Sequence, residues 1–432
     1  MDYFEEQIVR YERRIKKIKE HPDPKKLKSN VLLYECEMEL RKAQLKAWQE
    51  GTPLGSAPPR MQPLLRSLGM QHMDTETAAQ RTGQTDSLFD IVRQTGMTDE
   101  GCDMTIVPLA MCISKQIPPA DYIIGSYALC FPFFTSYYQI SRYFDVPFYA
   151  LDIPSEENEE NLHYVTTQLH ELIEDVERKV PGAKYDEDKL IELQEKNRMG
   201  FDYYRDIFEL LKTSPCPQAG KDSFAQSRLP SLSPNPDKFL EYLKSRRDEL
   251  GERVAKGIGA VAEEKLRIVW SVTGPFLYYD PFDFLEARGV SIPFLVMGAR
   301  NYANPGSSGS SGDAYYGDQK QYGRKLSPLE EEARANMGNV WACKGPKWVE
   351  ENASVCRDLH ADGLVHFMQW GCTPTLGIGR MLKERLEQDE GMPVLLLEGR
   401  QLQGGAMDIK RYEEKLEQFI VECLARKQNK AE

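Results

Sequence analysis

Two cysteines of this chain stand where an apolar strand pattern gives way to a helical one. Cys130 lies inside the segment 121–144, and Cys372 lies inside "DGLVHFMQWGCTPTLGIGRMLKE", residues 362–384. The positive end of a helix dipole lowers the pKa of a thiol at the helix N-terminus and so favours the thiolate. Because thiolate is the form of cysteine that binds metals, the two positions indicate metal-binding thiols. The alternative is that both cysteines are ordinary small apolar residues at turns.

A third cysteine favours a shared metal centre. Cys102 follows a glycine and has polar neighbours, whereas Cys112 lies among apolar residues of a helical pattern and is interpreted as a core residue. None of the nine cysteines forms the CxxC pair of zinc knuckles and ferredoxin-type sites. Three widely spaced thiolates therefore match neither of these sites, although a structural zinc protein stays open as an alternative.

Cys343, in "NVWACKGPKWV", is the main rival of Cys372 for the third ligand position. We favour Cys372 because it follows the end of a predicted strand, where ligands bind in parallel sheets. The remaining cysteines are interpreted as core or surface residues of helices and of a connecting segment; they are Cys36, Cys216, Cys356 and Cys423.

His366 lies in the strand pattern that leads to Cys372 and is the one candidate for a catalytic residue. From that strand it could approach the centre or donate a proton. The competing interpretation is a strand histidine that is hydrogen-bonded to the backbone. The catalytic residues are otherwise unassigned.

Two segments of the chain have the same plan. In residues 118–152 and again in 360–398, an aspartate precedes an apolar strand, a cysteine, a helix, a short break before a proline, and a second apolar strand. Asp121 stands nine residues before its cysteine, and Asp362 stands ten before its own. Each segment reads as a β-α-β unit, which predicts parallel sheets in two α/β domains. Each domain would then offer one cysteine to a cleft that the two share.

The chain divides into four predicted regions. Residues 1–95 are expected to form an N-terminal helical region, 96–155 the core of the first α/β domain, 156–264 a helical insertion with a Pro/Ser-rich connector, and 265–432 the second α/β domain. The segment 304–323, "NPGSSGSSGDAYYGDQKQYG", has too few apolar residues to hold a fixed structure and is predicted to be a mobile loop.

Composition limits the classes of protein that fit. The chain has 432 residues, 55 basic and 67 acidic, with a net charge of −12, which argues against a nucleic-acid binder. No apolar stretch approaches the length of about 18 residues that a membrane span needs. The odd number of cysteines and the charged N-terminal segment favour reduced thiols in the cytoplasm over a secreted disulfide framework.

These motifs resemble the benzoyl-CoA reductase and 2-hydroxyacyl-CoA dehydratase family, most closely the B-type (O-type) subunits of its ATP-dependent (class I) benzoyl-CoA reductases. The resemblance is carried by 101–130, 144–154, 361–372, 391–399 and "KRYEEKLEQFI". It implies two flavodoxin-like α/β domains with N-terminal helices and a helical insertion. It further implies a [4Fe–4S] cluster between the domains, held by three cysteines with one iron left open.

Matched residue by residue, the cluster ligands of the family fall on Cys102, Cys130 and Cys372. The family usually has an aspartate after the second cysteine; Phe131 stands there in this chain, so no role of that aspartate is carried over. Three thiolates fix the cluster while the fourth iron stays open as a Lewis acid toward a thioester carbonyl.

The resemblance implies a cytoplasmic subunit of an ATP-dependent benzoyl-CoA (aryl-CoA) reductase, an oxidoreductase that dearomatises the ring by low-potential electron transfer. Its expected partners are a homologous cluster-bearing subunit and a separate ATP-hydrolysing iron–sulfur activator. ATP hydrolysis elsewhere is consistent with the lack of a GxxxxGK[ST] motif in this sequence. Two alternatives stay open: an (R)-2-hydroxyacyl-CoA dehydratase subunit, and a non-catalytic cluster scaffold or electron relay.

Overall fold

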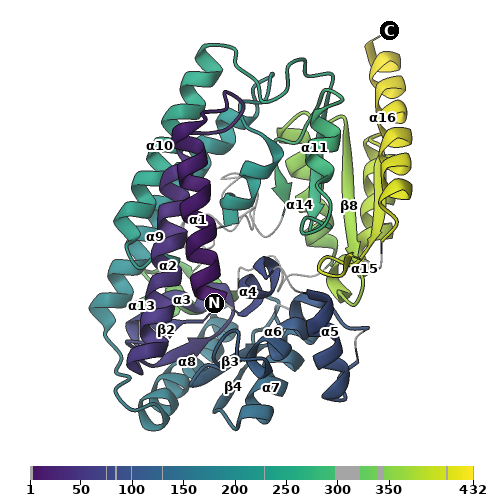
Figure 1. The fold of residues 1–432 in the computed structure, drawn as a ribbon. Helices are drawn as coiled ribbons and strands as arrows, with labels where there is room; N and C mark the ends of the chain where they lie inside the picture. The colour runs from purple at the N-terminus through teal and green to yellow at the C-terminus, as the bar shows by residue number, and fades with distance from the viewer. Residues whose placement is uncertain are drawn as a thin grey trace.

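The computed structural model shows two parallel sheets, each flanked by helices, beside a body of long helices (Figure 1). The residues that the structure describes are 3–73, 75–82, 85–98, 100–128, 130–227, 229–296, 322–337, 345–404 and 407–431. No helix among them is long and apolar enough to span a bilayer.

The first sheet lies in the lower lobe of Figure 1 and has the strand order β2-β1-β3-β4, all parallel. Its strands are β1 (Leu54–Ser56), β2 (Gln71–His72), β3 (Tyr122–Ser126) and β4 (Phe148–Leu151). Every residue of β3 is buried, as expected of a central strand covered on both faces. The helices of this lobe are α3 (Gln62–Ser67), α4 (Thr75–Arg81), α5 (Thr85–Gln94), α6 (Asp103–Ile113), α7 (Phe131–Phe144) and α8 (Glu159–Lys179).

The second sheet has the strand order β6-β5-β8-β9, with β7 paired to the distal part of β5. Its strands are β5 (Leu266–Val272), β6 (Val290–Ser291), β7 (Leu295–Val296), β8 (Gly363–Gln369) and β9 (Val394–Gly399). All pairs are parallel. The helices of this lobe are α11 (Pro281–Glu286), α14 (Gly345–Asp358), α15 (Thr373–Glu384), which continues as a π-helical turn (Arg385–Asp389), and α16 (Ile409–Ala431).

The two sheets have the same topology, in which the first strand lies between the second and the third. This 2-1-3-4 order is the flavodoxin-like order, so the predicted fold class is confirmed.

The aspartates of the repeated plan make equivalent hydrogen bonds in the two lobes. Asp121 Oδ2 accepts a hydrogen bond from the Leu54 N–H at 2.7 Å, and Asp362 Oδ2 accepts one from the Arg267 N–H at 2.9 Å. Each aspartate therefore fixes the start of the third strand against the first.

Long helices form the left side of the molecule in Figure 1 and connect the lobes. They are α1 (Tyr3–Glu20), α2 (Asn30–Glu50), α9 (Glu187–Leu211) and α10 (Pro236–Ala255). Apolar residues of α9 and α10 pack in one core with β5, whereas α8 and α13 (Pro328–Met337) share a core with β3. Short 3-10 turns at Pro59–Met61, Gly220–Ser227 and Pro230–Leu232 complete the connections.

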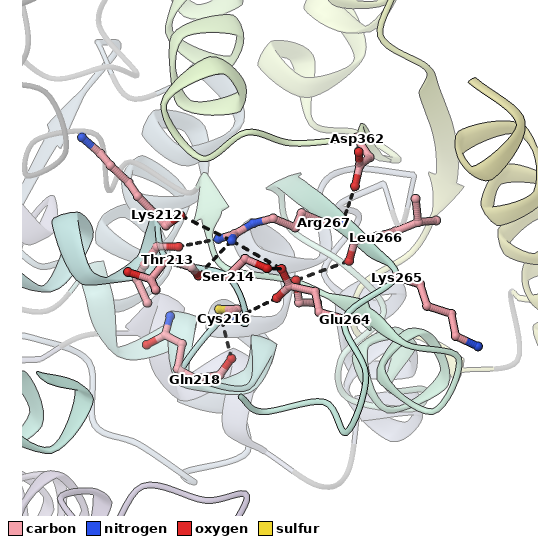
Figure 2. A network of polar contacts seen from close by, with 12 residues as sticks. Lys212, Thr213, Ser214, Cys216, Gln218, Glu264, Lys265, Leu266, Arg267 and Asp362 are labelled. Atoms are coloured by element: carbon pink, nitrogen blue, oxygen red, sulfur yellow. Dashed lines mark hydrogen bonds and ion pairs between the residues drawn. The ribbon is translucent and has the colours of Figure 1, made fainter. Parts of the chain in front are cut away.

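A buried polar network fixes the connector to the second sheet (Figure 2). The guanidinium of Arg267 donates to backbone carbonyls at the end of α9, including that of Thr213 at 2.9 Å. Glu264 accepts from the Ser214 hydroxyl at 2.8 Å and from the Cys216 N–H at 2.6 Å. Because Arg267 also belongs to β5, this network positions the helical insertion against the sheet.

One feature differs from the sequence-based expectations. Strands β1 and β2 lie within 1–95, which was expected to be helical; at three and two residues they are too short for an alternating pattern. The short strands β6 and β7 are separated by Pro293, which has no N–H for a sheet ladder. All but the last two residues of the predicted loop 304–323 lie outside the described residues.

Candidate metal centre

Three helix N-termini carry the three candidate cysteines. Cys102 directly precedes α6, Cys130 directly precedes α7, and Cys372 directly precedes α15. Cys130 follows β3 and Cys372 follows β8, which are the equivalent third strands of the two sheets. In flavodoxin-like sheets ligands bind at the carboxyl ends of the first and third strands, so both lobes present a thiol where their fold binds ligands.

The structure brings these thiols together. Cys102 belongs to a buried apolar cluster of the first lobe, and both Cys130 and Cys372 pack against that cluster. The thiols of Cys102 and Cys372 are in hydrogen-bond contact. Residues 270 positions apart in sequence, one from each lobe, therefore meet at one point.

The electrostatics of the pair are asymmetric. Its hydrogen bond to Cys372, burial and the neighbouring Cys130 raise the pKa of the Cys102 thiol. The same hydrogen bond lowers the pKa of Cys372, helped by the hydroxyl and backbone N–H of Thr375 in the first turn of α15. Cys372 is therefore the first of the two to become a thiolate, and the Cys102 S–H donates to it.

Close backbone approach at Gly371 makes this contact possible. Gly371 has a φ of +75°, and a Cβ there would lie 2.3 Å from both the Cys102 nitrogen and the Gly101 carbonyl carbon. Only glycine fits a position that has both a left-handed conformation and no room for a side chain. The sequence analysis missed this residue, although a glycine between a strand and a cysteine is a signal for close packing.

His366 supports the turn that carries Cys372. Its ring is fully buried, with Nε2 2.8 Å from the Thr375 carbonyl oxygen and Nδ1 3.0 Å from Ser271 Oγ. Because a carbonyl can only accept, Nε2 carries the hydrogen and Nδ1 accepts from the serine hydroxyl. Burial lowers the pKa of His366 to about 4. The neutral ring thus links β8 to the first turn of α15, with both nitrogens occupied.

The other cysteines that the structure describes lie in apolar interiors. Burial raises the pKa of each of them, as expected of core thiols; they are Cys36, Cys112, Cys216, Cys356 and Cys423. Cys343, the rival for the third ligand position, lies outside the described residues.

Exposed aromatic side chains flank two of the candidate cysteines. Phe131, next to Cys130, is 64% exposed, and Trp370, two residues before Cys372, is 39% exposed. The Tyr127 ring stacks on the Phe134 ring, with 3.8 Å between ring centroids, and also stacks on Phe131. We call Tyr127, Phe131 and Trp370 the aromatic rim of the site.

The donor set fits an iron–sulfur centre better than a single metal ion. Within the described residues no group of three or more histidine, cysteine or acidic side chains has the spacing of a metal-ion site. Cysteine thiolates are the usual ligands of iron–sulfur clusters. The hydroxyl of Ser56, at the carboxyl end of β1, is buried and has no hydrogen-bond partner within the described part of the chain, so it is a polar group left for a ligand.

Comparison with known proteins adds one match. A family model described as 2-hydroxyglutaryl-CoA dehydratase, D-component, matches residues 61–422. The match covers most of the chain, including the three candidate cysteines and all but the first strand of the two sheets. No protein of the curated set matched the chain.

Proposed function

The chain belongs to the family of the 2-hydroxyglutaryl-CoA dehydratase D-component, and from this premise we propose that it is the [4Fe–4S] subunit of an enzyme that transfers low-potential electrons to CoA thioesters. One observation carries the proposal: Cys102, Cys130 and Cys372 converge at three helix N-termini where the two lobes meet. Helix dipoles stabilise the thiolates that a cluster requires.

Within this class we propose an ATP-dependent benzoyl-CoA (aryl-CoA) reductase that converts the aromatic ring to a cyclohexadiene-carboxyl-CoA. Two features support this choice. The motifs around the cysteines resemble the B-type subunits of such reductases, and the aromatic rim offers flat faces against which an aryl ring can stack. The second candidate is an (R)-2-hydroxyacyl-CoA dehydratase subunit, which the description of the matching family favours.

Each element of the site has a distinct task in this proposal. A bound cluster would supply one electron at a time and an iron with an open position for a thioester oxygen. Cys102, Cys130 and Cys372 would hold it. The aromatic rim would exclude water and orient the acyl group, and neutral His366 would keep the Cys372 turn in place.

The proposed assembly has three kinds of component. We propose that this chain pairs with a homologous cluster-bearing subunit and receives electrons from an ATP-hydrolysing iron–sulfur activator. This assignment rests on the resemblance and on the lack of a phosphate-binding loop motif in the sequence.

The cluster is tested by anaerobic purification with counts of iron and acid-labile sulfide. We expect about four of each per chain, and a strong loss of both in Cys102→Ala, Cys130→Ala and Cys372→Ala. Cys112→Ala is the matched control. Cys112 lies on α6, the helix that Cys102 directly precedes, but its side chain is in the apolar core. Zinc without sulfide in the wild-type chain, or full iron in the three variants, would overturn the cluster.

The reaction is tested with partner and activator present, by following electrons consumed per product. The reductase consumes two electrons for each aryl-CoA converted, whereas a radical dehydratase recycles its electron. Dehydration of a 2-hydroxyacyl-CoA without net electron consumption would favour the second candidate. Full turnover by the Cys372→Ala subunit would instead indicate a scaffold whose partner holds the substrate.

A further inference from the structure

A buried ion pair joins the two lobes directly beside Cys102. Asp103, the first residue of α6, is fully buried, and its Oδ1 accepts from Arg400 Nη1 at 2.7 Å. Its other oxygen, Oδ2, accepts from the Leu402 N–H at 2.8 Å. Arg400 follows β9 of the second sheet, so both oxygens of a first-lobe carboxylate are occupied by donors of the second lobe.

Arg400 also interacts with residues on both sides of the thiol contact. Its Nη1 donates to the Gly101 carbonyl oxygen at 3.2 Å, directly before Cys102. Its guanidinium carbon lies 6.0 Å from the centroid of Trp370, two residues before Cys372. The Trp370 N–H in turn donates to the Gly399 carbonyl oxygen at 2.9 Å, which ties the Cys372 turn to the residue before Arg400.

These contacts form one continuous connection from one thiol to the other. It runs from Cys102 through Asp103 to Arg400, and from Arg400 through Trp370 to Cys372. A buried carboxylate–guanidinium pair with its hydrogen bonds satisfied has one favoured geometry, because any displacement leaves a charge buried without a partner. The pair can therefore fix distance as well as hold the lobes together.

We propose that Asp103 and Arg400 form an inter-lobe clamp that sets the separation of Cys102 and Cys372. They are positioning residues, since neither side chain is a cluster ligand. Their role in holding a cluster rests on the proposed function, whereas their effect on the two thiols does not.

The clamp is tested in the reduced, metal-free full-length chain by its reaction with oxidised glutathione. The Cys372 thiolate attacks the glutathione disulfide and releases one glutathione thiolate; the deprotonated Cys102 then attacks the Cys372 sulfur and releases the second. Two protein thiols are oxidised and one glutathione disulfide is reduced. The rate at which the Cys102–Cys372 disulfide forms, measured by mass spectrometry of non-reduced peptides, reports how well the two sulfurs are juxtaposed.

We expect Asp103→Ala and Arg400→Ala to slow disulfide formation by about tenfold or more, since a small misplacement of reacting groups has large effects on rate. Arg400→Lys keeps the charge but loses the planar guanidinium whose Nη1 donates to both Asp103 and the Gly101 carbonyl, so an intermediate rate is expected. Glu264→Gln is the matched control: it breaks a buried ion pair with Arg267, away from Cys102 and Cys372, and leaves the rate unchanged.

Two further measurements separate positioning from unfolding. The number of thiols that react with a bulky alkylating reagent stays at the wild-type value if a variant is folded, and Arg400→Lys provides the rate comparison if the alanine variants unfold. Wild-type disulfide rates in folded Asp103→Ala, Arg400→Ala and Arg400→Lys chains would overturn the clamp. Iron and sulfide counts are read separately: a wild-type chain that binds no cluster contradicts the proposed function, while the glutathione assay still decides the clamp.

Discussion

His366 shows at the scale of one residue how a buried polar group serves a site without taking part in its chemistry. The ring has a hydrogen-bond partner on each nitrogen, and one of these partners is the backbone carbonyl of Thr375. The side-chain hydroxyl of Thr375 in turn donates to the Cys372 carbonyl oxygen at 3.2 Å. Protonation would put a charge on a buried ring that has no carboxylate among its hydrogen-bond partners, and burial disfavours that charge. The neutral ring is therefore part of the folded structure.

This state of His366 predicts a pH dependence of stability. The pKa in the folded chain, about 4, lies below the ordinary value of 6.5, so the stabilisation is complete above pH 6.5 and is lost as pH falls toward 4. The full contribution is about 3 kcal/mol, from 1.36 kcal/mol per pKa unit. Urea unfolding between pH 7 and pH 4 should show this loss, and His366→Gln, which keeps a donor and an acceptor, should reduce it.

The exposed His163 provides the control for this measurement. His163→Gln makes the same substitution on the surface of α8 and should leave the pH profile as in the wild type. A profile of His366→Gln that coincides with the wild-type profile would show that other groups cause the loss at low pH.

At the scale of elements, both lobes repeat one arrangement of strand, turn and helix, and a glycine in the turn of the second lobe rests on the backbone of the first. Cys130 and Cys372 occupy equivalent positions, and Asp121 and Asp362 fix equivalent strands. Gly371, in the turn between β8 and α15, is the position where the backbone of one lobe rests on that of the other.

Gly371→Ala is expected to destabilise the chain by about 2 kcal/mol or more, because a left-handed conformation penalises any Cβ and this one would also meet the Cys102 backbone. Helix α15, which follows this turn, offers a matched control. Gly377, exposed on α15, has nothing within 4 Å of its would-be Cβ, and Gly377→Ala should stabilise the helix by about 0.5–1 kcal/mol. Denaturant unfolding of both variants measures the two changes in the free energy of unfolding. Equal changes would mean that the close approach at Gly371 has no energetic importance.

At the scale of the whole molecule, the proposed cluster would be a third connection between the lobes, next to the Gly371 contact and the Asp103–Arg400 clamp. A ligand that binds only the folded state stabilises that state, and the increase in local stability is expected to be largest in the elements that the ligand joins. The elements joined here are the first turns of α6, α7 and α15.

Hydrogen exchange should therefore slow on cluster loading at the N-termini of these three helices, by about tenfold or more relative to the metal-free chain. The α1–α2 pair, which carries none of the three candidate cysteines, should exchange equally in both forms. The comparison is made by anaerobic exchange and mass spectrometry, with Cys130→Ala as the chain that cannot load. Protection spread evenly over the molecule, or present in Cys130→Ala, would contradict a cluster held at these helix ends.

The sequence by itself determined the local structure. The β-α-β units, helix α7 over 131–144 and strand β5 over 266–272 follow from apolar periodicity and from prolines at helix starts, which act over a few neighbouring residues. It also placed Cys130 and Cys372 at strand ends. Strands β1 and β2 could not be predicted, because two or three residues carry no periodic pattern. Their stabilisation comes from pairing: β1 pairs with both β2 and β3.

Only the tertiary structure decided which groups meet. The contact of Cys102 with Cys372, the backbone approach at Gly371 and the pairing of Asp103 with Arg400 join residues about 270 to 300 positions apart. Nothing in the chain near Arg400 signals its partner, because a single arginine after a strand is equally compatible with solvent exposure. Such contacts arise when two separately specified lobes pack, since packing rather than local preference fixes the distances between them.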